Sequence, residues 1–95
     1  MDVEALKRKY GRIYEVSVED GENTYKGVFR RPDMGTMSAF TKLSKTDEFK
    51  AMQVLITNCF IEGDTEIKED ALVLMQAAGE LSSLVTAQKA TIKNL

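Results

Sequence analysis

The stretch RIYEVSV at residues 12–18 decides the fold class, because its side chains alternate between apolar and polar. Such alternation places Tyr14, Val16 and Val18 on one face of a strand and the polar side chains on the other. The pattern returns over residues 24–30, after a polar stretch at 19–23 that contains Gly21. The two segments predict an N-terminal β-hairpin, with strands at about 12–18 and 24–30.

Helical patterns follow the hairpin. Pro32 ends the second strand, because proline has no N–H to donate to a continuing ladder. Apolar residues then recur at helical spacing and predict three main helices, at about 36–44, 47–62 and 69–93. For the middle helix, Thr46 is the expected N-cap and Gly63 the expected left-handed residue that ends it. For the last helix, lysines at 89 and 93 suit the negative end of the helix dipole.

These elements predict one small α+β domain, mostly helical, over residues 1–95. Residues 1–11 are expected to form either a short helix or a flexible segment. The chain has no histidine and a single cysteine, Cys59, so an internal disulfide is excluded and a reducing, cytoplasmic setting fits best. No apolar run has the length of a signal peptide core or a membrane span, and we expect no membrane association.

The same residues argue against catalysis and against cofactors. Without histidine the chain lacks the commonest general base and a common metal ligand. A calcium loop starting at Asp64 fails, because its sixth position would be Glu69 and its twelfth Met75. The six glycines are scattered and match no phosphate-binding fingerprint. Cys59 has apolar helical neighbours and is expected in the core. We therefore predict a protein that is not an enzyme and uses no cofactor or metal.

Basic and aromatic residues are interleaved in the first third of the chain, which is one pattern of nucleic-acid-binding surfaces. Residues 1–31 carry seven bases and six acids, a net charge of only +1. This balance favours a solvated hairpin with aromatic side chains in the core over a nucleic-acid interface.

Apolar residues of the last predicted helix follow alternating spacings of four and three, which is typical of helices that pack as in coiled coils. This predicted partner or self-association seam consists of Leu74, Ala78, Leu81, Val85, Ile92 and Leu95, with Gln88 interrupting it. Either the seam meets another chain, including a second copy, or the helix lies across its own domain. The methionines at 34, 37, 52 and 75 either fill the core or add adaptable binding surface.

Three segments resemble the small tail assembly chaperones of tailed bacteriophages and prophages. They are YKGVFRRP at 25–32, LITNCFIEGD at 55–64 and a long terminal helix that ends in IKNL at 92–95, and together they span residues 25–95. In the family an aromatic residue, often Trp, follows the Asn-Cys pair, and here it is Phe60. These motifs are structural and not catalytic.

The resemblance implies a cytoplasmic, non-enzymatic protein that binds the long helical tape-measure protein while tail subunits polymerise around it. Two alternatives remain open. One is a structural virion component, such as a tail completion or connector protein, which would stay in the finished particle. The other is a small nucleic-acid-binding regulator that uses the basic hairpin and whose affinity falls steeply with salt.

Overall fold

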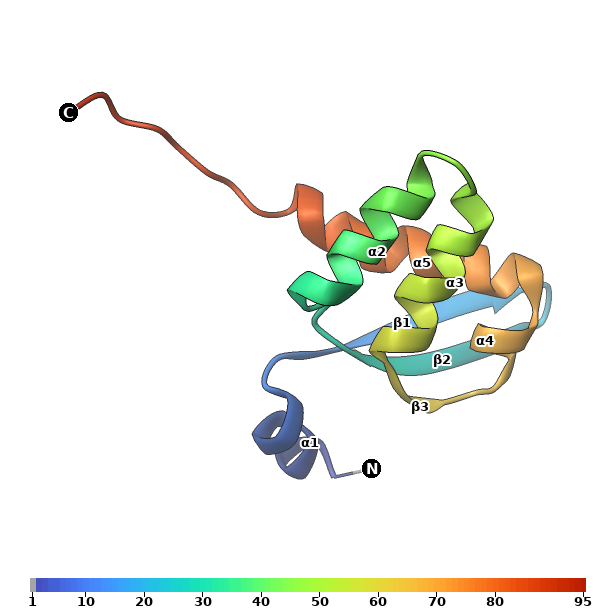
Figure 1. Ribbon diagram of the computed structural model, residues 1–95. Helices are drawn as coiled ribbons and strands as arrows, with labels where there is room; N and C mark the ends of the chain where they lie inside the picture. Colours follow the sequence, from blue (N-terminus) through green and yellow to red (C-terminus); the bar gives the residue numbers. More distant parts are fainter. Residues whose placement is uncertain (1) are drawn as a thin grey trace.

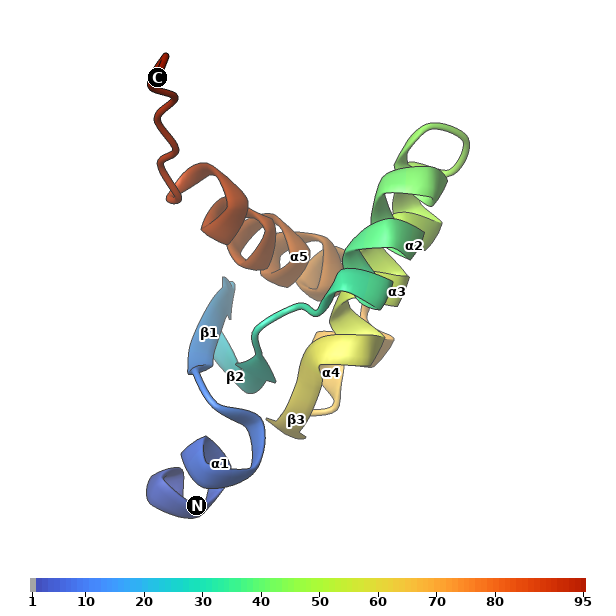
Figure 2. The same ribbon diagram turned by 60° about the vertical axis from the view of Figure 1, so that its left-hand side comes forward.

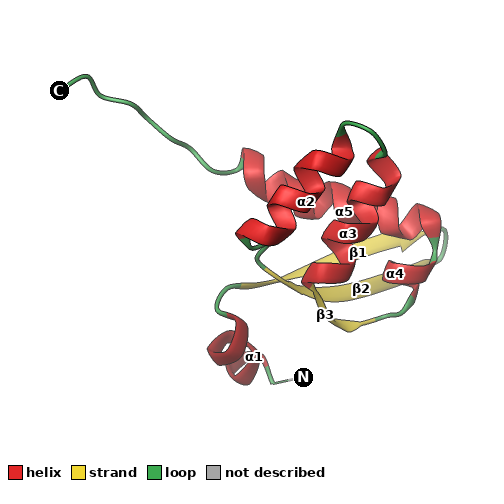
Figure 3. Cartoon of the chain, viewed as in Figure 1, coloured by secondary structure: helices red, strands yellow, loops and turns green. Residues whose placement is uncertain are grey.

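The protein has an α+β fold in which three helices gather on one side of a three-stranded antiparallel sheet (Figures 1 and 3). The structure is a computed structural model that describes residues 2–95, with the backbone alone at 85 and 86. The elements are α1 Val3–Tyr10, β1 Ile13–Asp20, β2 Asn23–Arg30, α2 Met34–Ser44, α3 Glu48–Cys59, β3 Phe60–Gly63, α4 Glu66–Glu69 and α5 Ala71–Thr86. The predicted fold class and N-terminal hairpin are confirmed.

The hairpin is longer than the alternation predicts. β1 and β2 pair from Ile13 opposite Arg30 to Asp20 opposite Asn23, which leaves a two-residue loop at 21 and 22. Gly21 occupies the first loop position with φ 62°, the conformation that a tight hairpin loop requires there. The polar strand ends join the ladder because its hydrogen bonds are made by the backbone, so they need no apolar side chain.

The middle predicted helix, at about 47–62, is present and starts where expected, but its N-cap and its end differ from the prediction. α3 begins after Asp47, whose carboxylate accepts from the N–H of Lys50 at 3.0 Å, so Asp47 and not Thr46 is the N-cap. The helix ends at Cys59, and residues 60–63 form β3 instead of its last turn. β3 pairs antiparallel with β2, with Gly27 opposite Gly63, and the register shifts between Val28 and Phe29.

Gly63 therefore ends a strand and does not cap a helix. Its φ of 139° and its approach to β2 both require glycine, since an added Cβ would lie 2.7 Å from the Cα of Gly27. The next residue fastens this junction. The Asp64 N–H donates to the Lys26 carbonyl at 2.8 Å, and the Asp64 carboxylate accepts from the Lys26 N–H at 2.8 Å.

The long predicted helix at 69–93 is also corrected. It divides into α4 and α5 at Asp70, whose carboxylate accepts from the N–H groups of Leu72 and Val73 at 3.0 and 3.2 Å. α5 ends at Thr86, and residues 87–95 continue without regular structure, away from the body of the protein (Figure 1). Ile92 and Leu95 are fully exposed there, so no packing supports further helical turns.

The core lies between the sheet and the helices α3 and α5. Its largest fully buried side chains include Phe29 from β2, Leu55 and Ile56 from α3, Ile67 from α4 and Leu81 from α5. Helix α1, in contrast, has no buried residue and lies beyond the start of β1, apart from the other helices (Figure 2). None of the helices in the described part of the chain has the length and hydropathy that crossing a bilayer needs.

A candidate protein-binding groove

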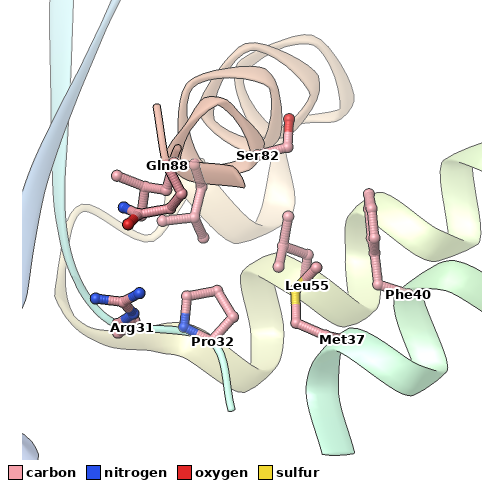
Figure 4. Close-up of a pocket in the computed structure, with 9 residues that line it drawn as sticks. Arg31, Pro32, Met37, Phe40, Leu55, Ser82 and Gln88 are labelled. Carbon is pink, nitrogen blue, oxygen red and sulfur yellow. The ribbon is translucent and has the colours of Figure 1, made fainter. Parts of the chain in front are cut away.

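An open, mostly apolar groove of about 250 Å³ lies where α2, α3 and α5 meet (Figure 4). Leu55 of α3 and Leu81 of α5 are buried core residues and form its floor. The other lining residues are Arg31 and Pro32 before α2, Met37 and Phe40 of α2, Ser82 and Leu84 of α5, and Gln88 beyond it. The groove thus has a buried apolar floor and partly exposed apolar walls, which suits the docking of apolar side chains.

The start of α2 positions one wall of the groove. Asp33 is its N-cap, and the Asp33 carboxylate accepts from the N–H of Thr36 at 2.8 Å. The same carboxylate forms an ion pair with Arg30 at 3.3 Å. The hydrogen bond from the Thr36 backbone, joined by the Thr36 hydroxyl and the charge of Arg30, holds the pKa of Asp33 below its ordinary value.

We expect Asp33 to make the stability of the protein depend on acid pH. A carboxyl whose pKa is lowered by folding stabilises the protein above its unfolded pKa, and this contribution is lost as pH falls through the folded value. Urea unfolding between pH 7 and pH 2 should therefore show a shallower acid decline for Asp33→Ala than for the parent protein. Parallel curves would contradict a role for this cap.

The groove continues onto the outer surface of α2. Met34, Met37, Ser38, Thr41 and Lys42 line a shallow hollow beside it, and Met34 is 89% exposed. Arg31 is exposed at the mouth of the groove, and Lys42 borders the adjoining hollow. Of the four methionines considered above, Met34 and Met37 thus line the surface here, whereas Met52 packs against the core.

The six predicted seam residues do not form one surface. Leu74, Ala78 and Leu81 are buried in the core of this chain, each 2% exposed. The side chain of Val85 lies outside the described residues. Ile92 and Leu95 are fully exposed but lie beyond the end of α5, so they do not continue its stripe. Contact of Ile92 and Leu95 with another chain stays a prediction.

The structure brings together groove residues that the sequence pattern did not group. Met37 and Phe40 fall on the predicted apolar stripe of the 36–44 helix, but Arg31, Pro32 and Leu84 were not singled out as site residues. No local signal could find them, because the lining comes from segments that are distant in sequence.

The other features considered as functional sites are the cysteine, a metal site and the aromatic residues of the hairpin. Cys59 is buried, as predicted, and burial raises the pKa of its thiol, which disfavours the reactive thiolate. Within residues 2–95 no cluster of three or more Cys, Asp or Glu side chains is arranged to hold a metal ion. Tyr25 packs against the core and Phe29 is fully buried, so these two aromatic residues of β2 do not offer a stacking surface for bases.

The comparisons with known proteins match nearly the whole length of the chain. The chain resembles a solved structure, the uncharacterised protein rbstp2171 from Bacillus stearothermophilus, with 28% sequence identity and a TM-score of 0.72. The match covers 98% of this chain and 100% of that one. No curated protein matches. The family described as a domain of unknown function (DUF6848) matches residues 6–92, and the chain therefore belongs to that family.

Proposed function

We propose that this protein is a non-enzymatic tail assembly chaperone of a phage or prophage, which binds a helix of the long tape-measure protein in the host cytoplasm. The observation that carries the proposal is the apolar groove between α2, α3 and α5. Its floor is formed by Leu55 and Leu81, and Phe40 and Leu84 wall it. The sequence resemblance over residues 25–95 supports the same function.

The size of the groove favours a helix over a small molecule. At about 250 Å³ it is smaller than the roughly 300–1,000 Å³ typical of small-molecule sites. An amphipathic helix needs only to insert a few apolar side chains and to rest its remaining surface on the rim. Met37 in the wall and exposed Met34 beside it give the surface the adaptability that suits helices of varied sequence.

The charges around the groove define the partner further. Arg31 stands at the mouth, Lys42 borders the adjoining hollow, and Lys89 follows Gln88 at the start of the segment beyond α5. We therefore expect the bound helix to carry carboxylates on both sides of its apolar face, because complementary rim charges orient a partner.

The extended segment 87–95 enlarges the proposed interface. Gln88 lines the groove, and Ile92 and Leu95 follow it with fully exposed side chains. A helix resting in the groove lies next to the point where this segment leaves the domain. Contact with the helix would cover both apolar side chains, which the protein otherwise leaves in water.

Co-expression with the long helical protein encoded nearby in the source genome tests the proposal. We expect the domain to keep that partner soluble and to co-purify with it. Met37→Glu should weaken the complex at least about 10-fold, because it places a charge in an apolar contact. Phe49→Glu is the control, since Phe49 is 36% exposed on α3 outside the groove, and it should leave partner binding unchanged.

The proposal would be overturned if an expressible partner neither stayed soluble nor co-purified. It would also be overturned if Met37→Glu and the control variant weakened partner binding equally. Persistence of the protein in purified particles would instead identify a structural virion component.

A further inference from the structure

We infer that the N-terminal helix α1 of one copy docks on the outer face of α5 of a second copy. This face consists of Leu72, Met75 and Gly79 and lies outside the groove described above. The inference does not depend on the proposed function, because it rests on two incompletely covered apolar surfaces of the same chain and on their charges.

Helix α1 has the pattern of a docking helix but is not packed as one. At about 100° per residue, Val3, Leu6 and Tyr10 fall on one stripe, and Lys7 and Lys9 lie on opposite sides of it. No residue of α1 is fully buried: Val3 is 39% exposed, and Leu6 and Tyr10 are half-buried. The Nζ of Lys9 lies 5.2 Å from the centre of the Tyr10 ring, which holds one cation at the edge of the stripe.

The outer face of α5 offers an apolar surface of matching kind. Leu72 is 72% exposed and Met75 is 41% exposed, although both lie on a helix whose opposite side forms the core. Gly79 follows them on the same face and is also exposed. Large apolar side chains next to one another on an exposed helix face are typical of an interaction surface.

Gly79 is the most informative residue of this face. Glycine in the middle of a helix is much less favourable than alanine, and such a position usually has a packing reason. The described residues of the chain supply no such reason, because a Cβ added at Gly79 would meet none of their atoms within 4 Å. A missing side chain lets a second helix approach the backbone of α5 closely, which the docking of α1 requires.

Acidic residues border this face on both sides. One hollow of about 260 Å³ between α5 and β1 is lined by Glu15, Glu19 and Glu80. Another hollow, of about 220 Å³ between α5 and the α2–α3 pair, includes Glu48. The lysines on both sides of the α1 stripe thus find carboxylates on both sides of the α5 face, a complementarity that orients the helix.

The accepting α5 belongs to another copy because α1 cannot reach this face in its own chain. Only residues 11 and 12 join α1 to β1, and two extended residues span roughly 7 Å at most. Figures 1 and 2 both place the sheet between α1 and α5. Each copy carries both surfaces, so a reciprocal exchange of α1 helices between two copies satisfies both pairs.

Sedimentation equilibrium of the full chain tests the inference. We expect concentration-dependent self-association that Gly79→Lys weakens at least about 10-fold. Because lysine is the better helix former and its Cβ has free space, the same variant should unfold at a higher urea concentration as a monomer. Loss of association without loss of folding is therefore the expected signature, and Leu72→Gln should reproduce the loss of association.

Charge reversal tests which surfaces meet. Lys7→Glu with Lys9→Glu should abolish self-association, and so should Glu48→Lys with Glu80→Lys, whereas an equimolar mixture of the two variants should associate again. Lys89→Glu with Lys93→Glu makes the same change in net charge outside both surfaces and should have no effect. A parent protein that stays monomeric at 1 mM, or variants that fail to restore association when mixed, would overturn the inference.

Discussion

Replacement of Phe29 by alanine is expected to lower the free energy of unfolding by about 3–5 kcal/mol. The Phe29 side chain is fully buried, and its ring meets Phe60 edge to face, with the centres 5.7 Å apart and the planes at 83°. An aromatic pair of this geometry stabilises the protein beyond the contribution of burying the ring. The ring also passes over Gly27, where an added Cβ would lie only 3.0 Å from it, so the substitution would leave a cavity in the core on this face of the sheet.

The loss is large for a domain of this size. Stabilities of roughly 0.05–0.15 kcal/mol per residue correspond to about 5–14 kcal/mol for 95 residues, so one substitution removes a substantial part of the total. Urea unfolding followed by circular dichroism measures it. Phe49→Ala is the matched control, because Phe49 is 36% exposed and should cost about 1 kcal/mol or less. Equal losses for the two variants would contradict the placement of Phe29 in the core.

Substitution of alanine for Gly63 is expected to cost about 2–4 kcal/mol, although it adds a single methyl group. The φ of 139° strains any residue with a Cβ, and the new atom would press on the Lys26 carbonyl and the Gly27 Cα. These neighbours are backbone atoms of β2, so relief requires the strands to separate. Such a movement would break the two hydrogen bonds between Asp64 and Lys26.

Gly21→Ala is the control that separates the cost of a positive φ from the cost of the contact between the new Cβ and β2. Gly21 also has positive φ, at 62°, but a Cβ there would meet nothing within 4 Å. We expect a cost of about 1–2 kcal/mol for Gly21→Ala from the left-handed conformation alone. Amide exchange of Asp64 should accelerate in Gly63→Ala and stay slow in Gly21→Ala. The explanation fails if Gly21→Ala proves as destabilising as Gly63→Ala.

Local patterns predicted the hairpin and the fold class, because alternation over residues 12–18 and 24–30 specifies strands without reference to distant residues. The boundary at Cys59 was not predictable in this way. Phe60 continues the apolar stripe of α3 and suits a strand equally well, and the pairing of residues 60–63 with the distant strand β2 decides between the two.

The end of α5 and the candidate groove escaped prediction for a related reason. Residues 87–93 have good helix formers, but their apolar side chains find no support in the folded domain, so the spacing of Ile92 and Leu95 was misleading. The groove is made by residues of three helices and their flanking segments, which lie between Arg31 and Gln88 in the sequence. Sequence periodicity detects the faces of single elements, and it cannot indicate which faces meet.

The order of the elements also determines when this protein can fold during its synthesis. The hairpin is complete once Arg30 has been added to the chain. The last buried core residue, Leu81 of α5, is synthesised much later. At roughly 5–20 residues per second the ribosome needs about 3–10 s to add the intervening chain. An isolated two-stranded hairpin is only marginally stable in water. The nascent chain should therefore remain largely unfolded until its last helix leaves the exit tunnel, and then fold as a unit.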